Sequence, residues 1–221
     1  MAGMPYSRSA YRNWSIKFVW PRLTLPGQCH ACSQWSWQAL CPACTRLGDA
    51  PADGNATNCV AAKLYVSPWK ELITAFKFER QVGLAYFLAQ QMRQTPAIAQ
   101  RLDACDWLVP VPLSAQRLRD RGFNQALVLA KQLCPERTLG QALIRLRDTP
   151  AQSGLSRSDR LVNLHHAFMV NPHCLPRLLN SRVVLVDDVT TTGTTLLACT
   201  QALQAAGVTQ VDSVVLARTP A

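Results

Sequence analysis

The sequence predicts an α/β protein with a parallel sheet, preceded by a small cysteine-rich module. Two observations lead to this fold class. From residue 60 onward, short apolar runs of strand length alternate with stretches of helical periodicity, an order that favours a parallel sheet. Ahead of them, two C-x-x-C pairs lie within 16 residues. A chain of 221 residues has room for one full α/β domain and one such module.

The composition divides the chain into four expected parts. The stretch 49–58 is rich in Pro, Gly, Asp and Asn, as linkers often are. We therefore expect an N-terminal tail over 1–25, a four-cysteine module over 26–50, a linker over 51–58 and the main domain over 59–221.

The N-terminal tail is basic, since it carries Arg8, Arg12, Lys17 and Arg22 and no acidic residue. Its apolar stretch, 16–20, is too short for the core of a signal peptide. No run in the chain approaches the roughly 18 apolar residues of a transmembrane helix. We expect a partly disordered tail and a cytoplasmic protein without a membrane span.

Four cysteines in two C-x-x-C pairs predict a structural zinc site: Cys29, Cys32, Cys41 and Cys44. Each pair offers two thiolates to one tetrahedral ion, and four thiolates leave no open position for catalysis. The eight-residue gap suits a small β-hairpin, since residues 34–38 alternate as a strand would. Redox chemistry or chance is the alternative. The other five cysteines are expected in the core, with Cys59 as a candidate extra ligand.

The elements of the main domain follow from hydrophobic pattern and turn residues. Apolar runs predict strands over 59–66, 106–112, 142–146, 182–186 and 210–217. Helical periodicity predicts helices over 68–79, 82–92, 123–133, 156–166 and 194–206. Ser67 is interpreted as the N-cap of the first helix with Pro68 at its first position, and Gly207 as the residue that ends the last helix.

The most informative stretch is 183–195, where four apolar residues precede two acids, a Thr/Gly-rich loop and the start of a helix. Backbone N–H groups and hydroxyls of the loop, with the helix N-terminus, would bind a phosphate monoester. Gly193 allows the backbone to approach it closely. The two carboxylates can bind vicinal sugar hydroxyls, directly or through Mg²⁺. The stretch predicts a ribose 5-phosphate site formed by Asp187, Asp188, Thr191, Thr192, Gly193, Thr194 and Thr195.

A plain strand–turn–helix capped by threonines is the alternative interpretation of this stretch. It leaves two adjacent acids at the end of a buried strand without a purpose, and burying them is costly. We therefore favour the ribose-phosphate site.

This stretch resembles the phosphoribosyl pyrophosphate (PRPP) signature of type I phosphoribosyltransferases, and the chain as a whole is similar to the ComF/GntX family of competence-associated proteins. The similarity includes the cysteine module and the motifs at 76–79 (Phe-Lys-Phe-Glu), 109–112 (Val-Pro-Val-Pro), 121–125 (Arg-Gly-Phe-Asn-Gln) and 145–149 (Arg-x-Arg-x-Thr), with Gln152, Arg160 and Asn163. It implies a type I phosphoribosyltransferase fold with a flexible hood. It also implies binding of PRPP with Mg²⁺ at Asp187 and Asp188, and a role in handling imported DNA.

The resemblance also implies roles for two basic segments. The turn after the strand at 109–111 would hold the diphosphate of PRPP, and a loop over 145–160 would close over it. Three arginines could then act in catalysis by stabilising the leaving diphosphate: Arg121, Arg145 and Arg147. A nucleic-acid backbone could be bound by Arg117, Arg119, Arg121, Arg157 and Arg160. A solvated surface role is the alternative for each arginine.

The charge balance favours polyanionic partners. The chain has 23 Lys and Arg against 13 Asp and Glu, a net charge of +10. Residues 117–160 hold nine basic and four acidic residues, so half of the excess falls on a fifth of the chain. This balance excludes an acidic solvating protein and favours phosphorylated metabolites, nucleic acid or an anionic membrane face. A diffuse basic surface is the alternative.

Three functions are consistent with the sequence. The first is a PRPP-dependent transferase with an unidentified acceptor. Purine-salvage relatives place a carboxylate three residues after the second acid, where this chain has Thr191. The sequence therefore leaves open whether the protein catalyses the transfer. The second, which we favour, is a handler of imported single-stranded DNA that binds PRPP and works with DNA-uptake proteins. The third is an adaptor whose zinc module docks a partner while the other site senses PRPP.

Overall fold

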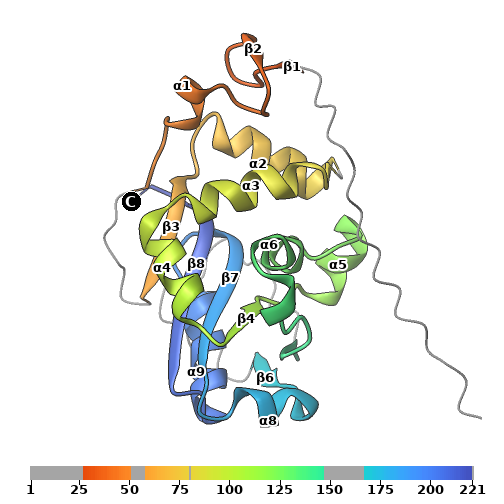
Figure 1. The fold of residues 1–221 in the computed structure, drawn as a ribbon. Helices are drawn as coiled ribbons and strands as arrows, with labels where there is room; N and C mark the ends of the chain where they lie inside the picture. Colours follow the sequence, from red (N-terminus) through yellow and green to blue (C-terminus); the bar gives the residue numbers. More distant parts are fainter. Residues whose placement is uncertain (1–26, 51–57, 80, 147–166, 221) are drawn as a thin grey trace, which may run out of the picture.

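The computed structural model describes residues 27–50, 58–79, 81–146 and 167–220 (Figure 1). Its centre is a parallel four-stranded sheet with the strand order β3-β8-β7-β4. The strands are β3 (Cys59–Leu64), β4 (Trp107–Pro110), β7 (Arg182–Thr190) and β8 (Gln210–Arg218). The α/β fold class and the strands expected at these four places are confirmed.

Helices cover both faces of this sheet (Figure 1). One face is packed by α2 (Trp69–Phe78), α3 (Leu84–Arg93), α4 (Pro96–Ala104) and α6 (Gln125–Leu133). The other face is packed by α9 (Thr194–Ala205), which ends as predicted before Gly207 with its φ of 88°. The helices expected near 68–79, 82–92, 123–133 and 194–206 are confirmed.

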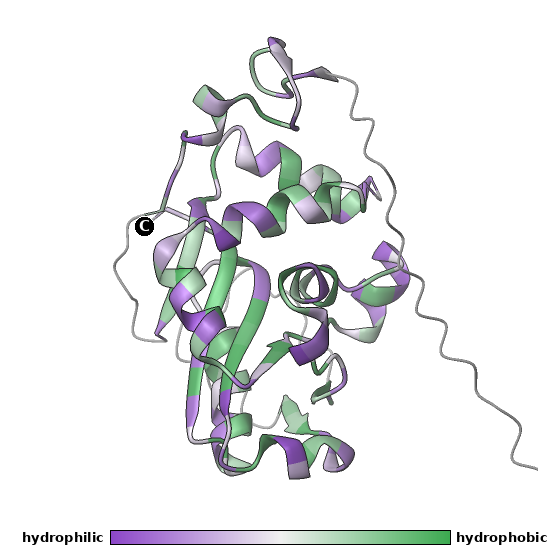
Figure 2. Ribbon diagram, viewed as in Figure 1, coloured by the Kyte–Doolittle hydropathy of each residue, from purple (hydrophilic) through white to green (hydrophobic). Residues whose placement is uncertain are grey.

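The uninterrupted apolar run of β7 has a simple physical reason, because both of its faces are buried. Successive side chains of a strand point to opposite faces. Val184 and Val186 pack with α2, α3 and α6, whereas Val183 and Leu185 pack with α9. Figure 2 shows the hydrophobic colouring concentrated along the strands of this sheet.

The structure corrects several details of the expected elements. Helix α2 begins at Trp69 with Pro68 as its N-cap, so Ser67 is not the N-cap and Pro68 is not the first helical residue. Strand β7 continues to Thr190 because β8 pairs with it as far as Arg218. Helix α4 and the seven-residue α5 (Ala115–Arg121) were not predicted. The helix expected over 156–166, the tail over 1–25 and residues 51–57 of the linker lie outside the described residues.

A second, smaller layer lies beside α9. Strand β5 (Leu143–Arg145) confirms the strand expected at 142–146 and pairs antiparallel with β6 (Phe168–Val170), which was not predicted. The short helix α8 (Leu175–Leu178) follows. Phe168 and Leu178 pack into the same hydrophobic cluster as α9 and the adjoining sheet face.

The cysteine-rich module comprises β1 (Gly27–Gln28), β2 (Trp35–Ser36) and the single turn α1 (Pro42–Thr45). Strands β1 and β2 pair antiparallel, but the hairpin expected within the gap between the two C-x-x-C pairs is wrong in its position. Its first strand precedes Cys29, so the first C-x-x-C pair lies between the two strands. The module is bonded to the main domain, since the Trp69 Nε1–H donates to the Leu47 carbonyl over 2.6 Å and Lys63 Nζ donates to the Thr45 carbonyl over 2.8 Å. Across the described parts of the chain, no helix has the length and apolar character needed to cross a bilayer.

Candidate functional site

Two adjacent carboxylates lie near the carboxyl end of β7. The last residue of β4, Pro110, pairs with Val186, so Asp187 and Asp188 extend beyond the end of that neighbouring strand. Their side chains point to opposite faces of the sheet. Asp188 is directed toward α2, where it meets Lys77, whereas Asp187 is close enough to Cys199 of α9 to affect its thiol electrostatically.

Lys77 is a site residue to which the sequence analysis assigned no role. Its Nζ lies 3.2 Å from Asp188 Oδ1, and the two side chains are only 12% and 9% exposed. Nζ also lies 6.0 Å from the centre of the Tyr65 ring. The available signal was the motif at 76–79, in which a lysine stands between two aromatic residues. Only the packing of α2 against the sheet shows that this lysine reaches an acid of β7.

The C-terminal end of α2 is fixed by aromatic packing. Phe76 is fully buried and its ring lies 5.6 Å from that of Phe123. Phe78 is 64% exposed, and the Arg121 guanidinium lies over its ring at 5.1 Å. Arg121 also donates from Nη1 to Gln125 Oε1 over 3.1 Å. Arg121 is therefore held at the same end of α2 as Lys77.

The electrostatics of the carboxylate pair are those of a crowded anionic site. Burial, followed by the charge of Asp188, raises the pKa of Asp187 to about 7. The Asp188 backbone N–H, which donates to Asp187 Oδ1 over 2.8 Å, opposes this rise, as do Lys77 and Arg121. Such a pair favours additional positive charge, and its oxygen donors suit a hard divalent cation such as Mg²⁺.

The expected phosphate loop connects β7 to α9. Gly193 adopts a left-handed conformation, with φ 74° and ψ 1°, and forms the N-cap of α9. Its carbonyl accepts the first helical bond, from Leu197 N–H over 2.9 Å. The first N–H groups of a helix have no partner within the helix, so those of Thr194 and Thr195 are positioned as anion donors. The hydroxyls of Thr192 and Thr194 lie 2.6 Å apart.

The arginines expected to bind anions occupy different places. Arg117 and Arg119 are exposed on α5, where Arg119 Nη2 donates to Gln116 Oε1 over 2.7 Å. Arg145 lies on β5, with its guanidinium 5.3 Å from the centre of the Phe168 ring. Among the candidate arginines that the structure describes, Arg121 is the one placed at the C-terminal end of α2, over Phe78, where its charge acts on Asp187. Three further candidates, Arg147, Arg157 and Arg160, lie outside the described residues.

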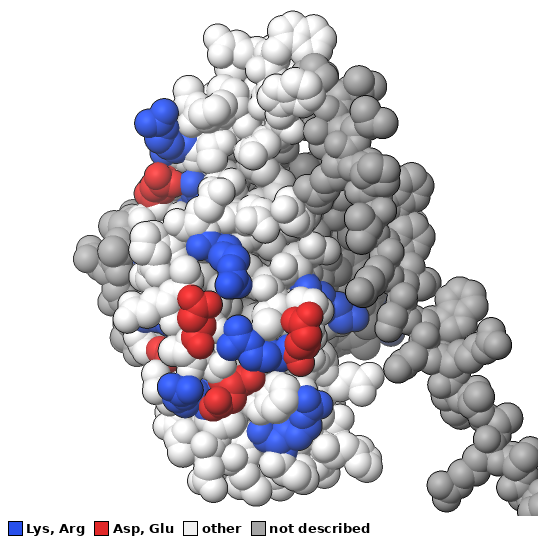
Figure 3. Space-filling view, viewed as in Figure 1, with Lys and Arg blue, Asp and Glu red and all other residues white. Residues whose placement is uncertain are grey.

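The basic excess is not gathered into one patch on the face drawn in Figure 3. Lys and Arg side chains alternate there with Asp and Glu over the main domain. Within the described ranges, Arg93 with Asp103 and Arg182 with Asp106 form ion pairs of this kind. On this face, the charged side chains do not form a continuous basic surface on which a nucleic-acid backbone could bind.

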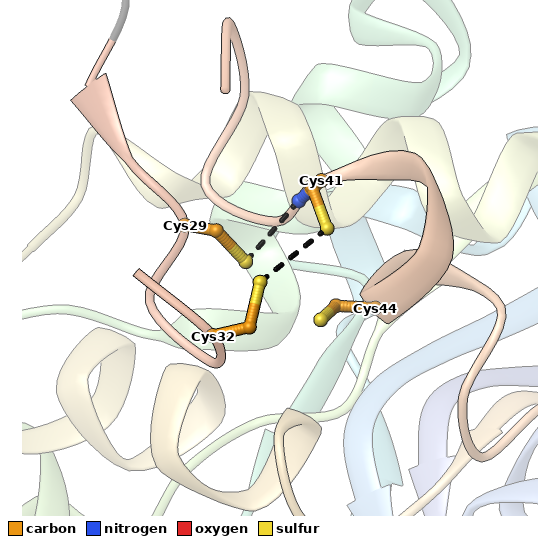
Figure 4. A group of neighbouring side chains, drawn as sticks. All are labelled: Cys29, Cys32, Cys41 and Cys44. Carbon is orange, nitrogen blue, oxygen red and sulfur yellow. Dashed lines mark hydrogen bonds between the residues drawn. The ribbon is translucent and has the colours of Figure 1, made fainter. Parts of the chain in front are cut away.

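The four cysteines of the module converge on one point (Figure 4). Their Sγ atoms all lie within 4.8 Å of one another, and Cys32 Sγ is 3.7 Å from Cys41 Sγ. A tetrahedral zinc ion with Zn–S bonds of about 2.3 Å requires sulfurs at about this separation. Within the described residues this is the one group of three or more His, Cys, Asp or Glu side chains that could share a metal ion. Cys59 is not part of it, because that side chain is buried in the sheet.

The thiols of this cluster differ in acidity, and the difference has a local cause. Burial opposes ionisation of Cys29, but backbone N–H groups of Cys41, Ala31 and Cys32 outweigh it and lower the pKa of its thiol to about 6. Burial and the three neighbouring sulfurs raise the pKa of Cys44 to about 12. Four thiolates at this separation repel one another unless a cation lies between them. The donor set therefore fits a structural Zn²⁺ site.

Comparison with known proteins agrees with this fold. The family model described as "Phosphoribosyl transferase domain" matches residues 119–221. Competence protein F of Haemophilus influenzae is 36% identical over 162 residues, which cover 70% of this chain and 69% of that protein. DNA utilization protein YhgH of Salmonella typhi is 31% identical over 232 residues, which cover 89% of this chain and 99% of that protein. Competence protein ComFC of Bacillus subtilis is 35% identical over 137 residues, which cover 60% of this chain and 52% of that protein.

The fold and the loop after β7 define a protein of the phosphoribosyltransferase class. The paired acids of β7 and the glycine that opens α9 both lie within the residues that match the family model. The similarity to DNA utilization protein YhgH covers 89% of this chain, and the similarity to Competence protein F covers 70% of it. The chain belongs to the ComF family.

Proposed function

We propose that this protein binds PRPP with Mg²⁺ at the carboxyl end of β7 and acts in the handling of imported single-stranded DNA. One observation carries the proposal. Two adjacent acids, a left-handed glycine and a helix N-terminus follow one another on β7 and α9, in a chain that aligns with nearly all of a DNA utilization protein. A ribose 5-phosphate needs a phosphate site beside diol acceptors, and this arrangement supplies both.

Each residue of the site would have a separate task. The N–H groups at the start of α9 and the hydroxyls of the loop would bind the 5-phosphate, and the two acids would bind the ribose hydroxyls and the metal. Arg121 would face the diphosphate, and Lys77 would hold the Asp188 carboxylate in place through their ion pair. Mg²⁺, when bound, would neutralise charge on the diphosphate oxygens.

Titration calorimetry with PRPP and Mg²⁺ tests this site. Binding should be lost in the D187N/D188N variant and retained in D103N, a matched change at an exposed carboxylate of α4. Release of diphosphate in the presence of nucleobase pools would show that the protein turns PRPP over. Equal PRPP affinity in the wild type and the D187N/D188N variant would contradict the proposal.

Arg117, Arg119 and Arg121 on α5 are the described cations that we assign to a nucleic-acid backbone. Arg117 and Arg119 are exposed on a helix that ends beside the proposed diphosphate site. The R117A/R119A variant should bind single-stranded DNA more weakly, with the salt slope reduced by about 1.4 for two lost phosphate contacts. K70A/K131A is the matched control, since it removes two exposed cations from other helices. An unchanged salt slope would exclude these arginines from the interface.

We also propose that the cysteine cluster holds a structural zinc ion and that the protein works in the cytoplasm with proteins of the DNA-uptake machinery. The four-thiolate donor set supports the first part. A reducing compartment keeps such thiols free of disulfides, which supports the second. Metal analysis of the purified chain and co-purification with uptake proteins test the two parts separately.

A further inference from the structure

Gln125 is a buried amide in the motif at 121–125, of which the proposed function uses only Arg121. Its side chain is fully buried, and its Oε1 accepts a hydrogen bond from Arg121 Nη1 over 3.1 Å. A guanidinium donates and cannot accept, so the amide oxygen, not Nε2, must face Arg121. Within the described ranges, Nε2 is one of two buried side-chain nitrogen or oxygen atoms that have no hydrogen-bond partner.

This unpartnered donor is costly, and packing does not account for it. A buried donor without an acceptor destabilises the folded state, whereas a leucine at this position would fill a similar volume without a polar group. An amide is therefore favoured here by what its oxygen does. The partner of that oxygen is Arg121.

The rest of the motif fixes the start of α6 against the carboxylate end of the sheet. Phe123 packs against Phe76 of α2, with the ring centres 5.6 Å apart. Asn124 is the N-cap of α6, and its Nδ2 donates to the Val111 carbonyl over 3.0 Å. The Val111 N–H donates to the Val186 carbonyl over 2.9 Å, and Val186 directly precedes the two acids of β7. The start of α6 is thus tied to the strand that carries the carboxylate pair.

The Arg121 guanidinium is held by two contacts of different kinds. It lies over the Phe78 ring at 5.1 Å, but contact with a ring face does not fix the direction of the individual N–H groups. The hydrogen bond to Gln125 does fix that direction. A guanidinium has five N–H donors and Gln125 engages one of them, which leaves others for a ligand. Bidentate binding of a phosphate group requires this planar fork to keep one orientation.

We infer that Gln125 is a positioning residue that orients the Arg121 guanidinium toward the diphosphate of PRPP, an inference that rests on the proposed PRPP site. Because Gln125 is fully buried, it acts through Arg121 and does not touch the ligand. An amide oxygen suits this task, since it accepts a hydrogen bond without carrying a charge. A glutamate would hold the arginine as firmly but would neutralise it, and the guanidinium would then attract the diphosphate less.

Titration calorimetry of the full chain with PRPP and with ribose 5-phosphate, each with Mg²⁺, tests this role, because only PRPP carries the diphosphate. Q125L should bind PRPP about 10-fold more weakly and ribose 5-phosphate within about 2-fold of the wild type. R121A should lose at least as much PRPP affinity, and R121A/Q125L should bind no more weakly than R121A, because the two residues act as one unit. Q132L, a change at an exposed glutamine of the same helix, is the control.

Thermal unfolding without ligand separates positioning from a structural role. Q125L should unfold at no lower temperature than the wild type, since the unpartnered amide is removed together with its bond to Arg121. A residue that only stabilised the fold would lower the melting temperature when replaced. Q125E, which keeps the shape of the side chain, should lose PRPP affinity to a similar extent and continues the test if Q125L does not fold.

Three outcomes would overturn the inference. They are a PRPP affinity of Q125L within about 2-fold of the wild type, an equal loss of affinity for ribose 5-phosphate, and a further loss in R121A/Q125L beyond that in R121A. Binding of neither ligand by the wild type would instead contradict the proposed PRPP site, and the inference would fall with it.

Discussion

Replacing Lys77 with methionine should lower the free energy of unfolding by about 3 kcal/mol at pH 8. The lysine Nζ lies 3.2 Å from Asp188 Oδ1, and with an effective dielectric constant of about 20 the attraction amounts to about 5 kcal/mol. The cost of desolvating the lysine, which the variant avoids, offsets part of this. Methionine retains an unbranched apolar side chain, so lost packing contributes little.

Urea unfolding in Mg²⁺-free buffer at pH 8 and pH 6 measures this effect. At pH 6, below the pKa of about 7 for Asp187, the carboxylate pair already holds a proton, so the loss should shrink to about 1–2 kcal/mol. K77R keeps a cation and should stay within about 1 kcal/mol of the wild type. K77M/D188N removes both charges and should recover most of the loss. An unfolding free energy of K77M within about 0.5 kcal/mol of the wild type at pH 8 would refute the reasoning.

Three further changes test other parts of the structure. The raised pKa of Asp187 means that the folded chain holds this proton more tightly than the unfolded chain. The contribution of Asp187 to stability is therefore fully present below about pH 4 and is lost as pH rises through 7. D187N should flatten this part of the pH profile of thermal unfolding without Mg²⁺, and identical pH profiles would contradict the reasoning. G193A places a side chain at φ 74° and should lower the free energy of unfolding by about 1–2 kcal/mol. The control G83A, at φ −57° with open space around it, should lower it by less than about 1 kcal/mol. Equal losses in the two variants would show that the left-handed conformation is not the cause. Chelation of zinc should release the ion and lower the melting temperature, as should C44S, and a melting temperature unchanged by a chelator that removes the metal would rule out a structural role.

Much of the fold could be predicted from the sequence because local pattern and burial agree. The run 183–186 is apolar at every position, and only a strand covered on both faces requires that. Gly193 and Gly207 stand where the backbone is left-handed, which few other residues tolerate. Helix α4 was missed although Thr95 and Pro96 mark its start, because its nine residues show only a short apolar period.

The site could be predicted only where its residues are adjacent in the chain. The acids, the loop and the helix start of 187–195 form one segment, and the two C-x-x-C pairs form another. Residues this close in the chain must also lie close in space, so their spacing predicts that they come together. Lys77 is separated from Asp188 by more than half of the main domain, and no local pattern connects them. The exposure of Trp35 and Trp37 could not be predicted, because alternation predicts a strand but does not reveal which face is covered.

The sequence by itself determined the fold class, the four clustered cysteines and the acidic and glycine residues of the loop after β7, since each depends on local spacing or on the period of burial. Tertiary structure alone decided that Lys77 meets Asp188, that Arg121 reaches the same end of α2, and that the module turns two indoles to solvent. The physical reason is common to all three. Ion pairing and exposure depend on which elements pack together, and residues far apart in the chain specify that packing jointly.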